Sequence, residues 1–116
     1  MPHLSIDPDY YRTLFDRWTN DIAMLPDFPT ELKEKLVALH FIMLAFAEGE
    51  EYSEDEIHEG IKDRNLFSVD HVQIRINLLQ QGFLVRFEKG SEFIYKTSKE
   101  FLTHAQWDSS IPGATQ

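Results

Sequence analysis

The 116-residue sequence contains no cysteine, which excludes disulfides, thiolate zinc sites and cysteine nucleophiles. Because cysteine-free chains fit a reducing compartment, we expect a cytoplasmic protein. Long apolar runs are absent too, since no stretch approaches the roughly 20 residues that a membrane span needs. The first ten residues, MPHLSIDPDY, lack the basic and apolar regions of a signal peptide. We therefore expect no membrane partner.

Positive charge is scarce and unevenly distributed. The chain has 11 Lys and Arg against 20 Asp and Glu, which gives a formal charge of −9. Residues 1–69 carry 15 acids and 6 bases, whereas residues 70–99 carry 5 bases and 3 acids, or +2. A general polyanion binder has a clear basic patch, so the composition disfavours that class. Any contact with nucleic acid would have to use residues 70–99.

The apolar residues that are present predict a chain rich in helices. Apolar positions recur at three- and four-residue steps, which is typical of helices packed on a core. Asp7 and Pro8 are favourable at the start of the first helix, Ser53 and Glu56 form a capping-box pattern, and Ser68 is a candidate cap. The predicted helices cover residues 8–24, 31–47, 54–62, 69–81 and 98–106.

A hairpin is predicted between the last two helices. Gly82 is a natural stop for the helix before it, and FLVRFE and EFIYK then alternate around the turn KGS. Helix, short strand, two helices and hairpin is the order of a winged helix-turn-helix domain. We predict a single α+β winged-helix domain over residues 1–106, with the first helix added in front and a short helix behind. Residues 107–116 are predicted to be a flexible tail.

The stretch from FPTELKEKLVAL to DHVQIRINLLQQGFLVRFEKGSEFIY, about residues 28–97, contains a pattern of spaced residues. They are Tyr52, Ser53, Glu54, Glu56, Ile57, Asp70, Arg75, Leu78, Gly82, Phe83, Leu84, Arg86, Gly90 and Tyr95. In these residues the middle of the chain resembles a bacterial family of unknown function that is sometimes fused to ArsR-type regulator domains. The resemblance implies a winged-helix, regulator-like module. His58 stands where the family usually has asparagine, and Ile76 where it has a second arginine.

The predicted recognition helix, 69–81, has a polar face without positive charge. At about 100° per residue, Gln73, Asn77 and Gln80 lie on one side, with Val72 and Ile76 flanking them. The three amides could bind adenine edges, but without nearby cations they would give little affinity for DNA. Apolar residues beside neutral amides suit a protein surface better.

Arg75 falls inside the apolar arc of the same helix, not on its polar face. A contact with phosphate or guanine is one interpretation. We favour a structural ion pair with a carboxylate of the preceding helix, Glu56, or with Asp70, because guanidinium geometry suits such pairs.

Two charged groups flank the predicted recognition helix. The predicted wing carries Arg86, Lys89 and Lys96, of which Lys89 at the turn is the best candidate for a phosphate contact. The segment EGEEYSEDEIHE is acidic and does not keep the register of a calcium loop. It is either a solvated face or a docking patch for a basic partner, formed by Glu50, Glu51, Glu54 and Asp55.

The histidines and the first helix leave two further alternatives. His40 lies in an apolar helix and is predicted to be a core histidine, whereas His58 and His71 could approach each other across neighbouring helices; nothing in their spacing requires a metal. No nucleophile–base arrangement is present. The aromatic stripe of the first helix either packs on the domain or forms a homodimer face, and its residues are Tyr11, Phe15, Trp18 and Ile22.

We therefore expect a non-catalytic regulatory module without cofactor or metal. The first hypothesis is that it binds a protein partner through the recognition-helix face and the acidic patch. The alternative is a DNA-binding transcriptional regulator of winged-helix type, which would be dimeric. An enzyme is the weakest class, since it would need His58 and His71 to converge on a metal. Fold alone does not decide between these classes.

Overall fold

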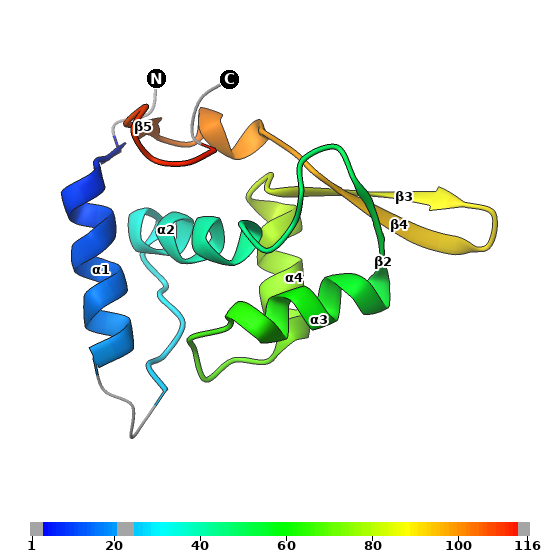
Figure 1. Cartoon of the computed structure of the whole chain (residues 1–116), viewed down its shortest axis with the longest axis horizontal. Coiled ribbons are helices and arrows are strands. Elements are labelled where there is room, and N and C mark those ends of the chain that lie inside the picture. Colours follow the sequence, from blue (N-terminus) through cyan, green and yellow to red (C-terminus); the bar gives the residue numbers. More distant parts are fainter. Residues whose placement is uncertain (1–3, 21–24, 114–116) are drawn as a thin grey trace.

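The structure, a computed structural model, describes residues 4–20 and 25–113. Within these residues the chain has a mixed α+β fold with four α-helices and a small antiparallel sheet (Figure 1). No helix in these ranges is both long and apolar enough to cross a membrane. The elements are β1 (Ser5–Ile6), α1 (Pro8–Asn20), α2 (Leu32–Met43), β2 (Glu51–Ser53), α3 (Glu54–Arg64), α4 (His71–Gln80), β3 (Leu84–Lys89), β4 (Glu92–Thr97), the 3-10 helix η1 (Glu100–Thr103) and β5 (Gln106–Trp107).

Local signals set where the helices begin. Asp7 Oδ1 accepts a hydrogen bond from the Tyr10 amide at 2.8 Å, as its place before Pro8 predicts. The capping box of Ser53 and Glu56 is also confirmed, with hydrogen bonds in both directions. The prediction for α4 was wrong, because its cap is Asp70 and not Ser68.

Several predicted ends differ from the observed ones. α2 ends at Met43, four residues before the predicted end at 47, and the chain then turns toward β2. α1 is described as far as Asn20, and residues 21–24 of the predicted helix lie outside the described residues, so the predicted end at 24 stays a prediction. The predicted helix over 98–106 is instead the single turn η1 followed by β5.

The three-stranded sheet has the order β2-β4-β3, so the short strand β2 and the outer strand β3 lie on either side of β4. Tyr52 of β2 and Arg86 of β3 both lie opposite Tyr95 of β4. The turn between β3 and β4 uses Gly90 in a left-handed conformation (φ 68°), as the sequence predicts. The outer part of the hairpin projects away from the helices (Figure 1).

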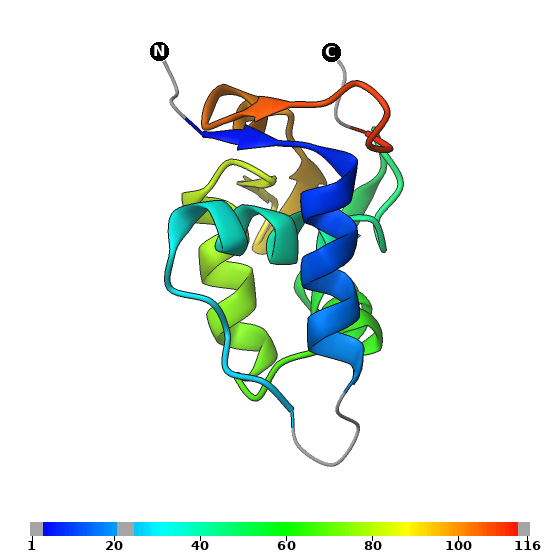
Figure 2. The same cartoon turned by 90° about the vertical axis from the view of Figure 1, so that its left-hand side faces the viewer.

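A second small sheet joins the two ends of the described chain. β1 pairs in parallel with β5, and the pair lies above α1 and α2 (Figure 2). The prediction of a flexible tail was therefore wrong for residues 107–113. Trp107 belongs to β5, and Ile111 is only 4 % exposed. These apolar side chains join the core, which fixes a segment whose small and polar residues suggested a loop.

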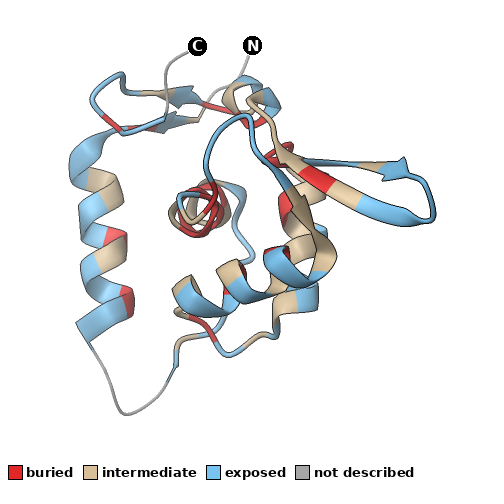
Figure 3. Ribbon diagram, turned by 45° about the vertical axis from the view of Figure 1, so that its right-hand side comes forward, coloured by how far each residue is buried: buried red, intermediate tan, exposed pale blue. Residues whose placement is uncertain are grey.

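α2 is the centre of the core, and the other helices surround it (Figure 3). The aromatic stripe of α1 faces this core, since Phe15 packs on Phe41 and Trp18 packs on Phe67, with ring centroids 4.9 Å apart in each pair. Trp18 is only 7 % exposed. The described part of the stripe thus packs on its own domain, the first of the two alternatives, and Ile22 lies outside the described residues.

Candidate functional site

α4 presents a neutral surface to solvent. Its inward side chains, Ile74 and Leu78, are fully buried, and this orientation leaves the opposite side outward. We call the outward set the α4 surface; it consists of Val72, Gln73, Ile76, Asn77 and Gln80.

Two apolar side chains are prominent on the α4 surface. Val72 is 37 % exposed and Ile76 is 36 % exposed, although both belong to residue types that usually lie inside. Asn77 donates a hydrogen bond from Nδ2 to the Gln73 carbonyl oxygen at 2.9 Å, so part of its amide is used within the helix. The α4 surface carries no charged residue, and the contacts it can offer are apolar contact and amide hydrogen bonding.

Arg75 lies beside this surface in a polar cluster between α3, α4 and β4. Its side chain is 16 % exposed and forms an ion pair with Glu54. The same carboxylate accepts a hydrogen bond from the Tyr95 hydroxyl at 2.9 Å. The predicted partner Glu56 was wrong, because its carboxylate turns back to accept from the Ser53 amide. Arg75 therefore connects α4 to the start of α3.

The same cluster contains two histidines. The rings of His58 and His71 lie 4.4 Å apart, and the Arg75 guanidinium donates to His58 Nε2 at 3.2 Å. Burial, together with the neighbouring His71 and Arg75, lowers the pKa of His58, which favours the neutral ring. Burial and the hydrogen bond to Glu54 raise the pKa of Tyr95. Among the described residues, no group of three or more His, Asp or Glu side chains is placed to hold a metal ion.

The cations of the hairpin are largely engaged within the chain. Lys89 Nζ lies 3.0 Å from a carboxylate oxygen of Glu51 on β2. The Arg86 guanidinium lies over the ring of Phe93, 4.5 Å from its centroid. Lys96 is on the central strand β4 and is half-buried. Lys89 and Arg86 would have to leave or share these contacts to reach a phosphate.

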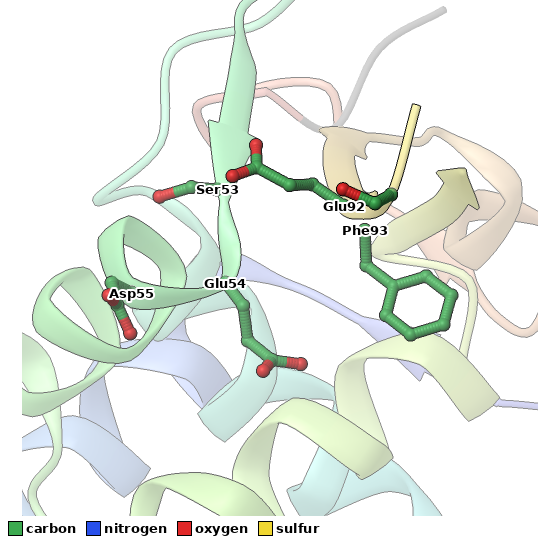
Figure 4. Close-up of a pocket in the computed structure, with 6 residues that line it drawn as sticks. Ser53, Glu54, Asp55, Glu92 and Phe93 are labelled. Atoms are coloured by element: carbon green, nitrogen blue, oxygen red, sulfur yellow. The ribbon is translucent and has the colours of Figure 1, made fainter. Parts of the chain in front are cut away.

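The predicted acidic patch is divided by the same interactions. Glu51 and Glu54 each face a cation, whereas Glu50 and Asp55 are exposed. A hollow of about 320 Å³ lies between the start of α3 and the start of β4. Figure 4 shows the Glu92 side chain extending toward the end of β2 and Glu54 turned toward the helices below. The sequence did not reveal this hollow, because Glu92 and Phe93 are about 40 residues from Ser53.

His40 is buried, as predicted, but its partners could not be read from its neighbours in sequence. The Tyr11 hydroxyl lies 2.7 Å from Nδ1, and the Pro112 carbonyl oxygen lies 2.8 Å from Nε2. Since a carbonyl only accepts, Nε2 carries the proton and Nδ1 accepts from Tyr11. Burial lowers the pKa of His40 to about 4, and burial also raises the pKa of Tyr11. This group holds α1, α2 and the C-terminal segment together.

One comparison with known proteins gives a match. The model of the family DUF2087, described as an uncharacterized protein conserved in bacteria, matches residues 24–94. This range includes α2, β2, α3, α4 and β3, and it therefore covers the α4 surface and the Arg75 cluster except for Tyr95. No curated protein and no solved structure matches the chain. Because the matched residues make up more than half of the 116, the protein belongs to the DUF2087 family of bacterial proteins.

Proposed function

We propose that this chain is a non-catalytic regulatory module of winged-helix type that binds a protein partner through the α4 surface. The observation that carries the proposal is the chemistry of that surface, where exposed Val72 and Ile76 flank neutral amides. Apolar groups beside amides are typical of protein interfaces, and a phosphate backbone offers them no favourable contact.

The arrangement of elements supports the winged-helix part of the proposal. α2, β2, α3, α4 and the β3–β4 hairpin follow the chain order of a winged helix-turn-helix domain, and β4 lies between β2 and β3. In helix-turn-helix proteins the second helix of the motif makes the specific contacts, and α4 has that place in this chain. The outward side chains of α4 are then the natural recognition surface.

The ion pairs that Arg75 and Lys89 form within the chain favour a protein partner over DNA. Phosphate neutralisation by Lys and Arg supplies nearly all non-specific affinity for DNA. Arg75 is paired with Glu54, and Lys89 is paired with Glu51. A DNA backbone would compete with these carboxylates, and the formal charge of −9 opposes its approach.

The exposed acids suit a basic segment on the partner. Glu50 and Asp55 stay exposed near the start of α3, and the hollow beside them is lined by Asp55 and Glu92. Charges at the rim of an interface chiefly raise the association rate and select partners. We propose that these acids guide a partner to the module and that the α4 surface supplies the binding energy.

DNA binding remains the second proposal, because the element order and the local charge of +2 over residues 70–99 also fit a regulator. Titration of labelled mixed-sequence duplex DNA, followed by fluorescence anisotropy at low and at physiological salt, separates the two. We expect no binding at low salt. Binding that falls steeply with salt, and that Lys89→Ala or Arg86→Ala weakens for every sequence, would establish the DNA-binding alternative.

The protein partner is tested by comparing two apolar-to-charged variants. Immobilised wild type, Ile76→Asp and Leu32→Asp are incubated with bacterial lysate, and the captured proteins are identified by mass spectrometry. Leu32 is 39 % exposed at the start of α2 and makes a matched control for Ile76 at 36 %. We expect a partner that the wild type and Leu32→Asp retain and that Ile76→Asp loses. Equal capture of every protein by all three forms would show that the α4 surface does not bind the partner.

A further inference from the structure

β3 forms one edge of the three-stranded sheet. Its only strand neighbour among the described residues is β4. Val85 is 43 % exposed, and Arg86, Glu88 and Lys89 are exposed as well. Figure 3 shows the outer hairpin coloured mainly as exposed and projecting from the body. An edge strand of this kind presents backbone groups that can pair with another strand.

The direction of the backbone groups along β3 follows from one hydrogen bond. The Ser98 amide donates to the Phe83 carbonyl oxygen at 2.9 Å, so the backbone groups of Phe83 point toward β4. The direction of the backbone groups alternates along a strand, and therefore those of Val85, Phe87 and Lys89 also point toward β4. The two-residue turn of Gly90 and Ser91 agrees, since such turns close on a hydrogen-bonded pair. The residues that direct their amides and carbonyls to the free edge are Leu84, Arg86 and Glu88.

This alternation limits how two copies of β3 could pair antiparallel about a two-fold axis. Residues whose backbone groups point to the free edge must lie opposite residues of the same kind on the other copy. The two-fold axis therefore passes between the two copies of one and the same residue, which lie opposite each other. An axis at Arg86 places two arginines opposite each other, and an axis at Glu88 places two glutamates opposite each other. An axis at Phe87 places Arg86 of each copy opposite Glu88 of the other.

The geometry points to β3 as a self-complementary edge through which a second copy of this chain pairs antiparallel, with Phe87 on the two-fold axis. Two Arg–Glu pairs then flank two phenylalanines, and cross-strand pairs of both kinds stabilise antiparallel sheets. Arg86 lies over the Phe93 ring of the neighbouring strand β4, and its long side chain would leave or share this contact to reach Glu88 of the second copy. No residue of the α4 surface takes part, so this inference stands apart from the proposed function.

The contact is small, and this sets its expected strength. Residues 85–89 span about 17 Å of strand, so the pairing buries less surface than a stable dimer does. We expect a dimer that dissociates on dilution and weakens at high salt, because its charge pairs are solvent-accessible.

Disulfide trapping tests the register directly, because the native chain has no cysteine. With Phe87 on the axis, the two Cα atoms at position 87 lie about 4.5 Å apart, within the range that a disulfide bridges. Phe87→Cys with diamide as oxidant should give a covalent dimer on a non-reducing gel. Val85→Cys is the control, since the two positions 85 lie about 14 Å apart across the axis. A stronger dimer from Val85→Cys than from Phe87→Cys would overturn the register.

Charge-reversal variants test the pairing of the two β3 strands without a covalent bond. Sedimentation velocity over a concentration series should give a mass that rises from 13.6 kDa for the wild type. Arg86→Glu and Glu88→Arg should each remain monomeric, and the two variants mixed should form a heterodimer. Glu92→Arg, on β4 of the same hairpin, should dimerise as the wild type does. A wild type that stays monomeric up to about 1 mM, or single variants that dimerise normally, would refute the inference.

Discussion

His40 is a buried imidazole whose neutral form is held by two hydrogen bonds. Its pKa is lowered to about 4 by burial, whereas in the unfolded chain it is 6.5. Between these values the unfolded state binds more protons, so lowering the pH favours unfolding. The contribution of His40 to the free energy of unfolding is present above pH 6.5 and is lost as the pH falls toward 4. We expect a loss of up to about 3 kcal/mol, measured by urea unfolding between pH 7 and pH 4.5.

A His40→Gln variant isolates this effect from the carboxylates that titrate in the same range. Glutamine keeps a donor and an acceptor but does not titrate. The variant should be less stable at pH 7, and its stability should depend less on pH between 6.5 and 5. Parallel pH profiles for the variant and the wild type would show that His40 does not carry the dependence.

Arg75 is predicted to act through structure. Its removal leaves Glu54 and His58 without their cationic partner in a cluster that is partly buried. Because the Glu54 side chain is 45 % exposed, we expect Arg75→Ala to reduce the free energy of unfolding by about 1–3 kcal/mol. Arg12→Ala breaks the exposed pair with Asp9 and should cost less than about 0.5 kcal/mol. Thermal unfolding of both variants checks this, and equal melting temperatures would contradict the assignment.

The turn from α4 into β3 depends on Gly82. Its φ of 81° suits glycine, and a Cβ there would lie 2.9 Å from the Glu100 Cβ and 3.0 Å from the Phe101 amide nitrogen. Gly82→Ala should therefore cost about 3 kcal/mol or more, from backbone strain and from displacement of η1. Gly90→Ala meets no atom within 4 Å and should cost about 1–2 kcal/mol from strain alone. Chemical denaturation measures the free energy of unfolding of both variants. Equal losses would show that η1 moves away from a Cβ at position 82 without loss of stability.

Signals within a few residues of each other predicted most elements. Asp7, the Ser53–Glu56 box, Gly82 and the KGS turn all act locally, and the structure bears each of them out. The same box explains the wrong partner for Arg75, because a Glu56 that caps its own helix cannot also reach α4. Helical angle placed Arg75 inward correctly, but which of several acids it would meet depended on how α3 and α4 pack.

Contacts between distant residues could not be predicted. Lys89 meets Glu51 across 38 residues, and His40 meets Pro112 across 72. The C-terminal segment contains Trp107 and Ile111 among serines and glycine, too few apolar residues to give a periodic pattern. Its order comes from a core already formed by α1 and α2, which only the folded chain presents.

The C-terminal segment is thus expected to be part of the folded unit, and Ile111 is the residue that tests it. Its side chain is 4 % exposed and neighbours Pro112, which accepts from His40. Ile111→Ala should reduce the free energy of unfolding by about 2–4 kcal/mol through the lost burial and the cavity left behind. Loosening Pro112 should also admit water to His40, raise its pKa toward 6.5 and weaken the pH dependence described above. Leu44→Ala, at 38 % exposure beside the same segment, should cost less than 1 kcal/mol and leave the pH profile unchanged. If urea unfolding gave Ile111→Ala the stability of the wild type, residues 107–113 would not be held on the core.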